Sequence, residues 1–269
     1  MDLTELKAGI RASWSLGNYP ELARELEPAA QALVDGCAIS AGQEVLDVAA
    51  GTGNVAVLAA REGADVVASD LTPALLDQGR ARAAEEGLDI EWVEADAEDL
   101  PFDSARFDCV TSSFGVMFAP RPEVAAGEMF RVVKPGGTVG VASWTPDGFS
   151  GQLFARQGKF APRGYEDLPD PVEWGEEETV RRRFEGLAAR LSAEKKSVRF
   201  AFDSTAQMWE FFRQNAGPLV AAEKGMPPDA FAAMRTDVLD LIREWGGGSG
   251  DGPVAIDSEY LLVVARKRG

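Results

Sequence analysis

The sequence contains no histidine among its 269 residues. Histidine has the ordinary pKa nearest to neutral pH, so its absence removes the side chain most often used as a general base. It also excludes histidine-ligated metal sites and the Ser-His-Asp and Cys-His catalytic systems. We therefore expect no metal site of that kind, and a chemistry that depends on other groups.

Cysteine and long apolar runs are also scarce. Cys37 and Cys109 are the only cysteines, so the sequence predicts no disulfide framework and favours a reducing compartment. No apolar run approaches the roughly 20 residues needed to cross a bilayer. The first six residues lack the basic start and apolar core of a signal peptide. We expect a soluble cytoplasmic protein without membrane insertion.

Positive charge is in short supply. The chain has 27 Lys and Arg residues against 44 Asp and Glu residues, a net charge of −17. Nucleic acids and anionic membranes are bound chiefly through Lys and Arg. This balance argues against a nucleic-acid partner and favours a small-molecule substrate.

What is present is a regular alternation of strands and helices. Apolar strands are expected at about 44–48, 64–70, 89–94, 106–113 and 138–144, with helices between them at 55–61, 72–86 and 121–133. Such alternation predicts a doubly wound α/β fold with a parallel sheet and helices on both faces.

A glycine turn follows the first of these strands. Gly51-Thr52-Gly53-Asn54 comes directly after the strand and before a helix, an order that lets a ligand approach the backbone closely. The run satisfies G-x-G-x-x-[GA], and Asp70 lies 19 positions after Gly51. Both features are also typical of dinucleotide sites, so an NAD-dependent oxidoreductase is one interpretation.

Two further acids favour another ligand. Asp47 lies four residues before Gly51, where a carboxylate would repel a pyrophosphate but attract an ammonium group. Asp96 lies just beyond the third strand, where it can accept a hydrogen bond from an exocyclic amine such as that of adenine. A ligand with an amino acid at one end and adenosine at the other fits these acids better than NAD, and no Tyr-x-x-x-Lys proton donor is recognisable.

These residues resemble the class I S-adenosylmethionine-dependent methyltransferases, and most nearly the ubiquinone/menaquinone-biosynthesis subgroup. The resemblance covers about residues 45–144 well and the final strand loosely. It implies a seven-stranded, mostly parallel sheet with an antiparallel last strand, and S-adenosylmethionine as the cofactor. Asp70 resembles the acid that holds the ribose hydroxyls, and Leu71 its apolar neighbour on the adenine. Asp96 and Ala97 match positions that bracket the adenine amine.

The remaining cofactor contacts that the resemblance implies lie in the glycine motif, after the fourth strand and near the N-terminus. Ser113 and Phe114 match residues that line the sulfonium, and Trp14 and Tyr19 resemble N-terminal aromatics that close over the cofactor. The cofactor-binding set implied by the resemblance is Trp14, Tyr19, Asp47, Ala49, Gly51, Thr52, Gly53, Asn54, Asp70, Leu71, Asp96, Ala97, Ser113 and Phe114.

Outside the core we expect helices before residue 40 and a looser, Gly- and Pro-rich stretch at 146–175. Beyond it the patterns predict a helix at 176–191, a strand at 195–202, helices at 205–224 and 229–245, and a last strand at 258–266. The expected organisation is N-terminal cap helices over 1–40, a cofactor-binding core over 41–145, and 146–269 as the remainder of the sheet, with a helical substrate cap inserted at about 204–250.

The expected reaction is methyl transfer to a small, partly apolar organic acceptor. A sulfonium is already an activated donor, so alignment and exclusion of water supply most of what the enzyme must add. No residue is assigned as a catalytic base. The aromatic and apolar content of the late region suggests such an acceptor: Phe149, Phe154, Phe160, Trp209, Phe211, Phe212 and Met226. Two interpretations stay open for Trp209, Phe211 and Phe212, which either line a substrate pocket or pack the cap against the sheet. A non-catalytic S-adenosylmethionine-binding protein is the alternative beside the oxidoreductase.

Overall fold

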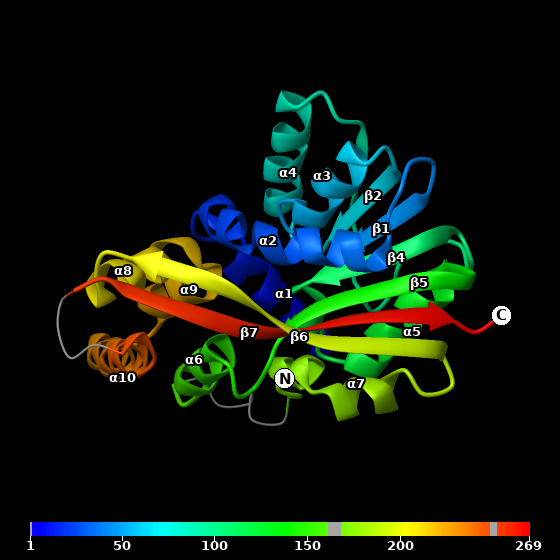
Figure 1. Ribbon diagram of the computed structural model, residues 1–269. Coiled ribbons are helices and arrows are strands. Elements are labelled where there is room, and N and C mark those ends of the chain that lie inside the picture. Colours follow the sequence, from blue (N-terminus) through cyan, green and yellow to red (C-terminus); the bar gives the residue numbers. More distant parts are fainter. Residues whose placement is uncertain (1, 161–167, 248–251) are drawn as a thin grey trace.

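The computed structural model describes residues 2–160, 168–247 and 252–269, and shows a seven-stranded sheet with helices on both faces (Figure 1). The strand order is β3-β2-β1-β4-β5-β7-β6. Strands β1 to β5 pair in parallel, and β7 runs antiparallel to both β5 and β6. The strands are β1 (Glu44–Val48), β2 (Asp65–Asp70), β3 (Ile90–Glu94), β4 (Phe107–Ser113), β5 (Val133–Trp144), β6 (Ala188–Phe202) and β7 (Val254–Lys267). The predicted fold class, including the antiparallel last strand, is confirmed.

Helices cover the sheet from two sides. Helix α2 packs with α3 on one face, where a Cβ atom on Gly140 of β5 would collide with Sγ of Cys37. Helices α5 and α7 lie on the other side and meet through Phe130 and Phe184 (Figure 1). The α-helices are α1 (Leu3–Trp14), α2 (Tyr19–Cys37), α3 (Asn54–Arg61), α4 (Pro73–Glu85), α5 (Pro122–Val132), α6 (Phe149–Gly158), α7 (Glu177–Arg183), α8 (Thr205–Asn215), α9 (Gly217–Gly225) and α10 (Pro228–Gly246), and two 3₁₀ turns are η1 (Val116–Phe118) and η2 (Pro171–Gly175).

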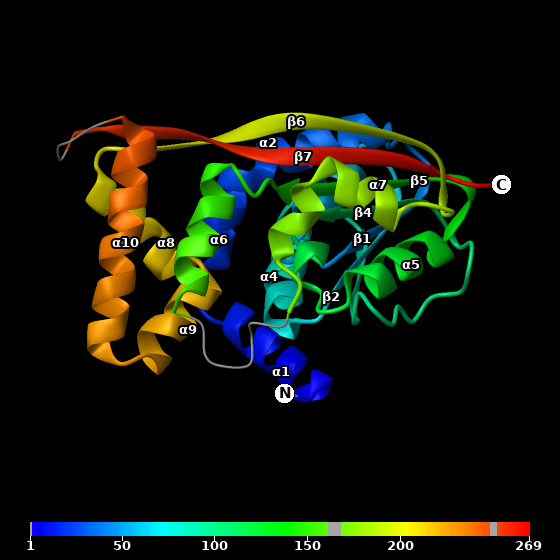
Figure 2. The same ribbon diagram turned by 90° about the horizontal axis from the view of Figure 1, so that it is seen from below.

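The strands β6 and β7 continue past the sheet as a two-stranded ribbon. β5 pairs with β7 only from Tyr260 to Arg266, whereas β6 pairs with β7 back to Val254. Helices α8, α9 and α10 lie at the far end of this ribbon (Figures 1 and 2). The last residues of the helical segment expected at 204–250 lie outside the described residues.

Several predicted boundaries after residue 145 are wrong. The helix expected over 176–191 ends at Arg183, and Ala188 already begins β6. Gly186 at φ +79° makes the turn, and the first half of β6 is a strand because it pairs with Leu262–Lys267 of β7. The loose stretch at 146–175 contains α6 and η2, although residues 161–167 lie outside the described part. The helix expected at 205–224 is divided at Ala216.

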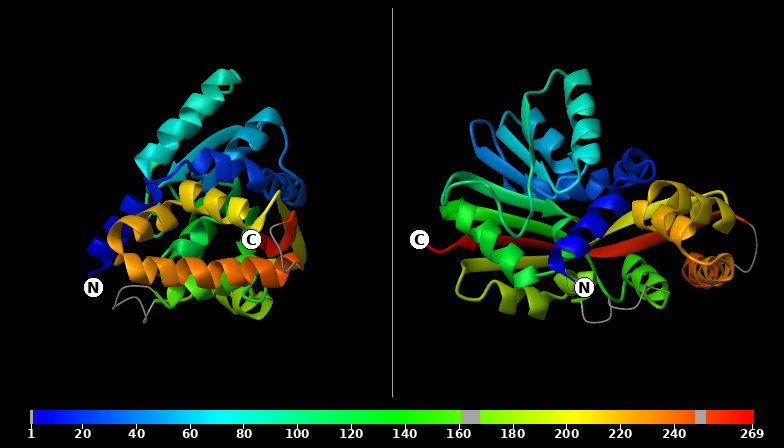
Figure 3. Two further views of the ribbon diagram at one scale, coloured as in Figure 1. Left: turned by 90° about the vertical axis from the view of Figure 1, so that its left-hand side faces the viewer. Right: turned by 180° about the vertical axis from the view of Figure 1, so that it is seen from behind.

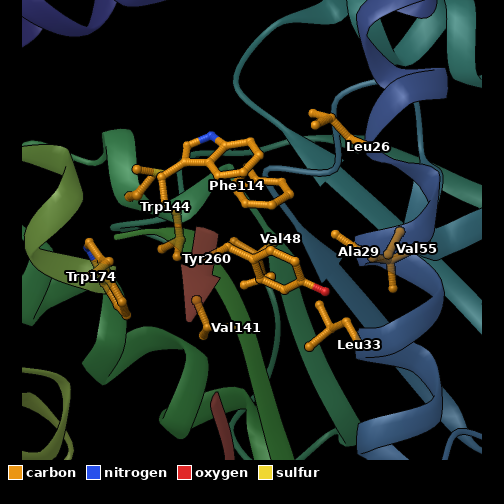
Figure 4. Packing of buried hydrophobic residues seen from close by; sticks show 14 of the residues in the cluster. Leu26, Ala29, Leu33, Val48, Val55, Phe114, Val141, Trp144, Trp174 and Tyr260 are labelled. Carbon is orange, nitrogen blue, oxygen red and sulfur yellow. The ribbon is translucent and has the colours of Figure 1, made fainter. Parts of the chain in front are cut away.

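An aromatic stack closes the core next to the ends of β4 and β5 (Figure 4). The rings of Phe114 and Trp144 lie 4.0 Å apart and are 17° from parallel, and Tyr260 of β7 meets both edge-on. Aromatic pairs of this kind stabilise a core beyond the area they bury. The stack fixes the backbone after β4, which forms one wall of the site described next.

Candidate functional site

A hollow lies at the carboxyl ends of β1 to β4, under α1. It holds about 710 Å³ of empty space, part of it open to solvent. The residues that line it come from α1, from the start of α2, from the end of β2, from the segments after the four strands and from the start of α4: Lys7, Ile10, Trp14, Tyr19, Ala49, Gly51, Asp70, Leu71, Thr72, Leu75, Ala95, Asp96, Ala97, Phe114, Gly115, Val116, Phe118, Ala119 and Pro120. Ligands of open α/β sheets bind at this edge. Nine of the fourteen predicted cofactor residues line this hollow.

The two glycines of the turn after β1 have different surroundings. Gly51 has φ +58° and lines the hollow, and a Cβ atom on it would lie 3.1 Å from Cε1 of Tyr19. Gly53 has φ +79°, and a Cβ atom on it would lie 2.5 Å from Cη2 of Trp92. Gly51 therefore keeps the backbone accessible to a ligand, whereas Gly53 makes room for the Trp92 ring and does not line the hollow.

Asp70 ends β2 and ties the turn after β1 to the turn after β2. Its carboxylate accepts hydrogen bonds from the backbone N–H groups of Gly51 and Thr72, both at 2.8 Å. Burial raises the pKa of this carboxyl above its usual value, and the two N–H groups oppose that shift. Thr72 stands before the first residue of α4, but its side chain makes no capping hydrogen bond.

Asp47 is buried behind the glycine turn. It accepts a hydrogen bond from the Ala56 N–H at 3.1 Å and one from the Thr111 hydroxyl at 3.2 Å. Burial raises the pKa of Asp47 to about 7, although both hydrogen bonds lower it. Asp47 lies on a second, smaller hollow of about 300 Å³, lined by Tyr19, Leu26, Asp47, Ala50, Thr52, Asn54, Val55, Ser113 and Phe114. The two hollows share Tyr19 and Phe114, and between them they account for every predicted cofactor residue except Gly53.

The side chain of Asn54 makes hydrogen bonds within the protein. Its Nδ2 donates to the carbonyl of Ala23 at 2.6 Å, and its Oδ1 accepts from Arg82 at 2.7 Å. The side chain thus links α2, α3 and α4. Any contact of Asn54 with a ligand would therefore compete with these bonds.

Asp96 belongs to a network of charges that sequence reasoning missed. Its Oδ2 lies 2.5 Å from Nζ of Lys7, and its Oδ1 accepts from the Glu98 N–H at 2.9 Å. Lys7 also lies 2.5 Å from Oε2 of Glu98. A signal was present, because Lys7, Ile10 and Trp14 share one face of a helix at spacings of three and four.

Aromatic rings close the hollow on the side of α1. Trp14 meets Tyr19 at 5.7 Å and Phe118 at 5.2 Å between ring centroids. The pKa of Tyr19 is raised above its usual value, first by burial and then by the nearby carboxylates of Asp70 and Asp47. Tyr19 therefore holds its proton near neutral pH. Phe118 was not predicted, since nothing in η1 marks it in the sequence.

The seven aromatic and apolar residues of the late region lie away from both hollows. None of them lines either hollow among the described residues. Phe149, for example, is fully buried and packs against Phe212 and Trp245. Phe154 reaches the rim indirectly, through its contact with Phe118 at 5.9 Å. These aromatics pack the late helices against each other and the sheet.

Comparison with known proteins identifies the family. A methyltransferase domain family matches residues 45–137. The uncharacterized protein Rv1405c of Mycobacterium tuberculosis is 39% identical over 267 residues, 98% of this chain and 96% of that protein. The YcgJ protein of Bacillus subtilis has the same fold, with a TM-score of 0.64 at 18% identity over 89% of this chain and 98% of that one. The chain belongs to the class I S-adenosylmethionine-dependent methyltransferases.

Because the chain belongs to this family, its cofactor is S-adenosylmethionine, and the interpretation as an NAD-dependent oxidoreductase is set aside. Likeness to the menaquinone subgroup is partial. The demethylmenaquinone methyltransferase of Clavibacter sepedonicus is 44% identical over 105 residues, 39% of this chain and 42% of that enzyme. Within the described ranges, no helix of the methyltransferase is both long and apolar enough to cross a bilayer.

Proposed function

We propose that this methyltransferase transfers the methyl group of S-adenosylmethionine to a small, partly apolar organic acceptor. The observation that carries the proposal is the mixed lining of the larger hollow. Asp70 and Asp96 contribute carboxylates to its wall, and Ile10, Val116 and Phe118 contribute apolar side chains. Sites for small molecules combine such apolar walls with a few placed polar groups.

The residues fit the cofactor in the following arrangement. Asp70 accepts hydrogen bonds from the ribose hydroxyls while it keeps the bonds from Gly51 and Thr72. Leu71 and Ala97 pack on the adenine, and Asp96 accepts from its amine. Asp47 attracts the amino group of the methionine part from the smaller hollow, together with Thr52, and Asn54 joins them where the ligand displaces its bonds to Ala23 and Arg82.

When bound, the cofactor supplies a methyl group activated by a sulfonium. Ser113 and Phe114 then line the reacting carbon, and Trp14 and Tyr19 cover it and exclude water. The apolar wall aligns the acceptor, and alignment can lower such a barrier by roughly 7–11 kcal/mol when the geometry is close to that of the reaction. The net charge of −17 favours a small molecule over a nucleic acid, and the two buried free thiols suit the cytoplasm.

A transfer assay tests the proposal. The protein is incubated with methyl-labelled S-adenosylmethionine and a panel of phenols, quinones, amines and thiols, with DNA and RNA alongside. We expect label on at least one small apolar acceptor and none on nucleic acid, and we expect Asp70→Ala to lower the signal when the cofactor concentration is below saturation. Label on nucleic acid, with none on the small molecules, would overturn the proposal.

A further inference from the structure

The C-terminal end of α1 is fixed against the late helices. The N–H of Asn18 donates to the carbonyl of Gln214 at 3.2 Å. A Cβ atom on Gly17, which has φ +78°, would lie 2.9 Å from the Asn215 carbonyl oxygen, and one on Gly217 would lie 2.3 Å from that of Ser13. Backbone packs directly on backbone here, so this end of the helix cannot shift far without moving α8 and α9.

The N-terminal half of α1 is held by Lys7. Its side chain is 14% exposed and lies 2.5 Å from carboxylate oxygens of both Asp96 and Glu98. The Glu98 side chain is fully buried and also accepts from the Arg121 backbone N–H and from its Nε, at 2.5 and 2.7 Å. Lys7 therefore connects α1 to two fixed acids that belong to the segment after β3.

The other contacts of α1 with this region are of a different kind. Leu6 is the one buried residue of α1 and supplies apolar packing. Arg11, one turn beyond Lys7, pairs with Glu94 at 2.6 Å, but these side chains are 45% and 50% exposed. Exposed ion pairs contribute little, whereas removing one member of a buried pair leaves an uncompensated charge. Lys7 is thus the main polar anchor of this half of the helix.

Helix α1 also forms the cover of the larger hollow. Lys7, Ile10 and Trp14 all line it, and α1 crosses the ends of the sheet in the right-hand view of Figure 3. A ligand enclosed beneath these three residues leaves when the helix swings away. Helix α1 is thus held by backbone packing at Gly17, beyond its C-terminal end, and by the ion pairs of Lys7 in its N-terminal half.

We propose that Lys7 latches α1 over the cofactor, so that breaking its contacts with Asp96 and Glu98 sets the rate at which cofactor and product leave. The turn at Gly17 is the hinge. Lys7 is then a positioning residue, which acts through α1 and Asp96. This inference rests on the proposed place of the cofactor in the larger hollow.

Two measurements on three variants test the latch. Hydrogen exchange of residues 3–14 is measured in the protein without ligand, and dissociation of S-adenosylhomocysteine is measured by stopped flow. We expect Lys7→Met to speed both at least fivefold. Lys7→Arg, which keeps the charge, should leave both rates close to those of the unsubstituted protein. Arg11→Met should change either rate by less than twofold. Lys7→Gln replaces Lys7→Met if the latter does not fold.

The outcomes distinguish failure of the proposed role of Lys7 from failure of the proposed cofactor site. Unchanged exchange in Lys7→Met overturns the latch whatever the ligand does. Faster exchange with unchanged dissociation shows that Lys7 holds α1 but does not retain the cofactor, which also overturns the proposal. If Asp70→Asn leaves binding of S-adenosylhomocysteine intact, the proposed site fails, and the latch over that site fails with it.

Discussion

The backbone N–H of Gly51 donates a hydrogen bond of 2.8 Å to the carboxylate of Asp70. This bond joins the glycine turn after β1 to the end of β2. The parallel register, in which Val48 lies beside Ser69, brings the two segments together. Asp70 therefore shapes the turn as well as facing the hollow, and its substitution affects both stability and binding.

We predict that Asp70→Ala weakens binding of S-adenosylmethionine at least about tenfold. The variant loses hydrogen bonds to a charged acceptor, worth roughly 1.5–3 kcal/mol. Its melting temperature falls as well, because the N–H groups of Gly51 and Thr72 lose their acceptor. Calorimetric titration well below the melting temperature separates the two effects. Asp77→Ala, on the exposed surface of α4, is the control, and an unchanged dissociation constant in Asp70→Ala would refute the assignment.

Asp47 predicts a dependence of stability on pH. Its pKa of about 7 in the folded protein exceeds the value of about 3.9 of an unfolded chain. The folded state thus holds a proton that the unfolded state has lost between about pH 4 and pH 7. The contribution of Asp47 to the free energy of unfolding therefore falls as pH rises through this window, by at most about 1.4 kcal/mol per pH unit.

Asp47→Asn removes this titration, and an asparagine can still accept from Ala56 and donate to Thr111. We expect the free energy of unfolding of Asp47→Asn to decline less than that of the unsubstituted protein between pH 4 and pH 7. Urea denaturation at half-unit steps of pH measures both curves. Parallel curves would show that Asp47 is ionised throughout.

Two helical glycines form a matched pair for packing. A Cβ atom on Gly79 of α4 would lie 2.4 Å from the Trp92 ring, whereas one on Gly127 of α5 meets nothing within 4 Å. We predict that Gly79→Ala destabilises the fold by about 1–3 kcal/mol through overpacking. Gly127→Ala should stabilise it by up to about 1 kcal/mol through helix propensity.

Denaturation curves of the two variants check this pair. Adding Trp92→Leu to Gly79→Ala should recover part of the loss, because the smaller side chain leaves space for the methyl group. Equal effects of the two alanine substitutions would contradict the close approach of Trp92 to Gly79 of α4.

The position of Trp14 predicts that ligand binding changes the tryptophan fluorescence. Its indole lies on the wall of the larger hollow, against Tyr19 and Phe118. We expect S-adenosylhomocysteine to change the tryptophan emission, and Trp14→Phe to lose most of that change. Trp245→Phe, on the exposed surface of α10, should retain it. If Trp14→Phe keeps the full change, another tryptophan reports binding and Trp14 does not cover the ligand.

The parts of the site that the sequence predicts well are local. Asp47, Gly51 and Asp70 lie on or beside two neighbouring strands, and strand, turn and helix patterns place them at one sheet edge. Lys7 and Asp96 lie 89 positions apart. Their contact depends on how α1 crosses the sheet, which no short pattern specifies. The start of β6 is likewise decided by its pairing with β7 and not by the local sequence pattern.

The aromatic residues of the late region show a second limit. Their number suggested an apolar acceptor and left open whether Phe212 lines a pocket or packs the cap, and Phe212 packs against Phe149 in the core. A stretch of sequence rich in apolar residues can form either a core or the wall of a pocket, so composition does not distinguish the two. Only the arrangement of the helices separates the two, and it leaves Phe118, from a three-residue turn, on the hollow.

The ribbon of β6 and β7 links the placement of the late helices to the cover of the larger hollow. Residues 197–202 of β6 and 254–259 of β7 pair only with each other, beyond the point where β5 ends. Helices α8 and α9 lie at the far end of this ribbon (Figure 1), and the turn after α1 packs on their backbone at Gln214 and Gly217. A change in the length of the ribbon would therefore alter the support of α1 without replacing any residue that lines either hollow.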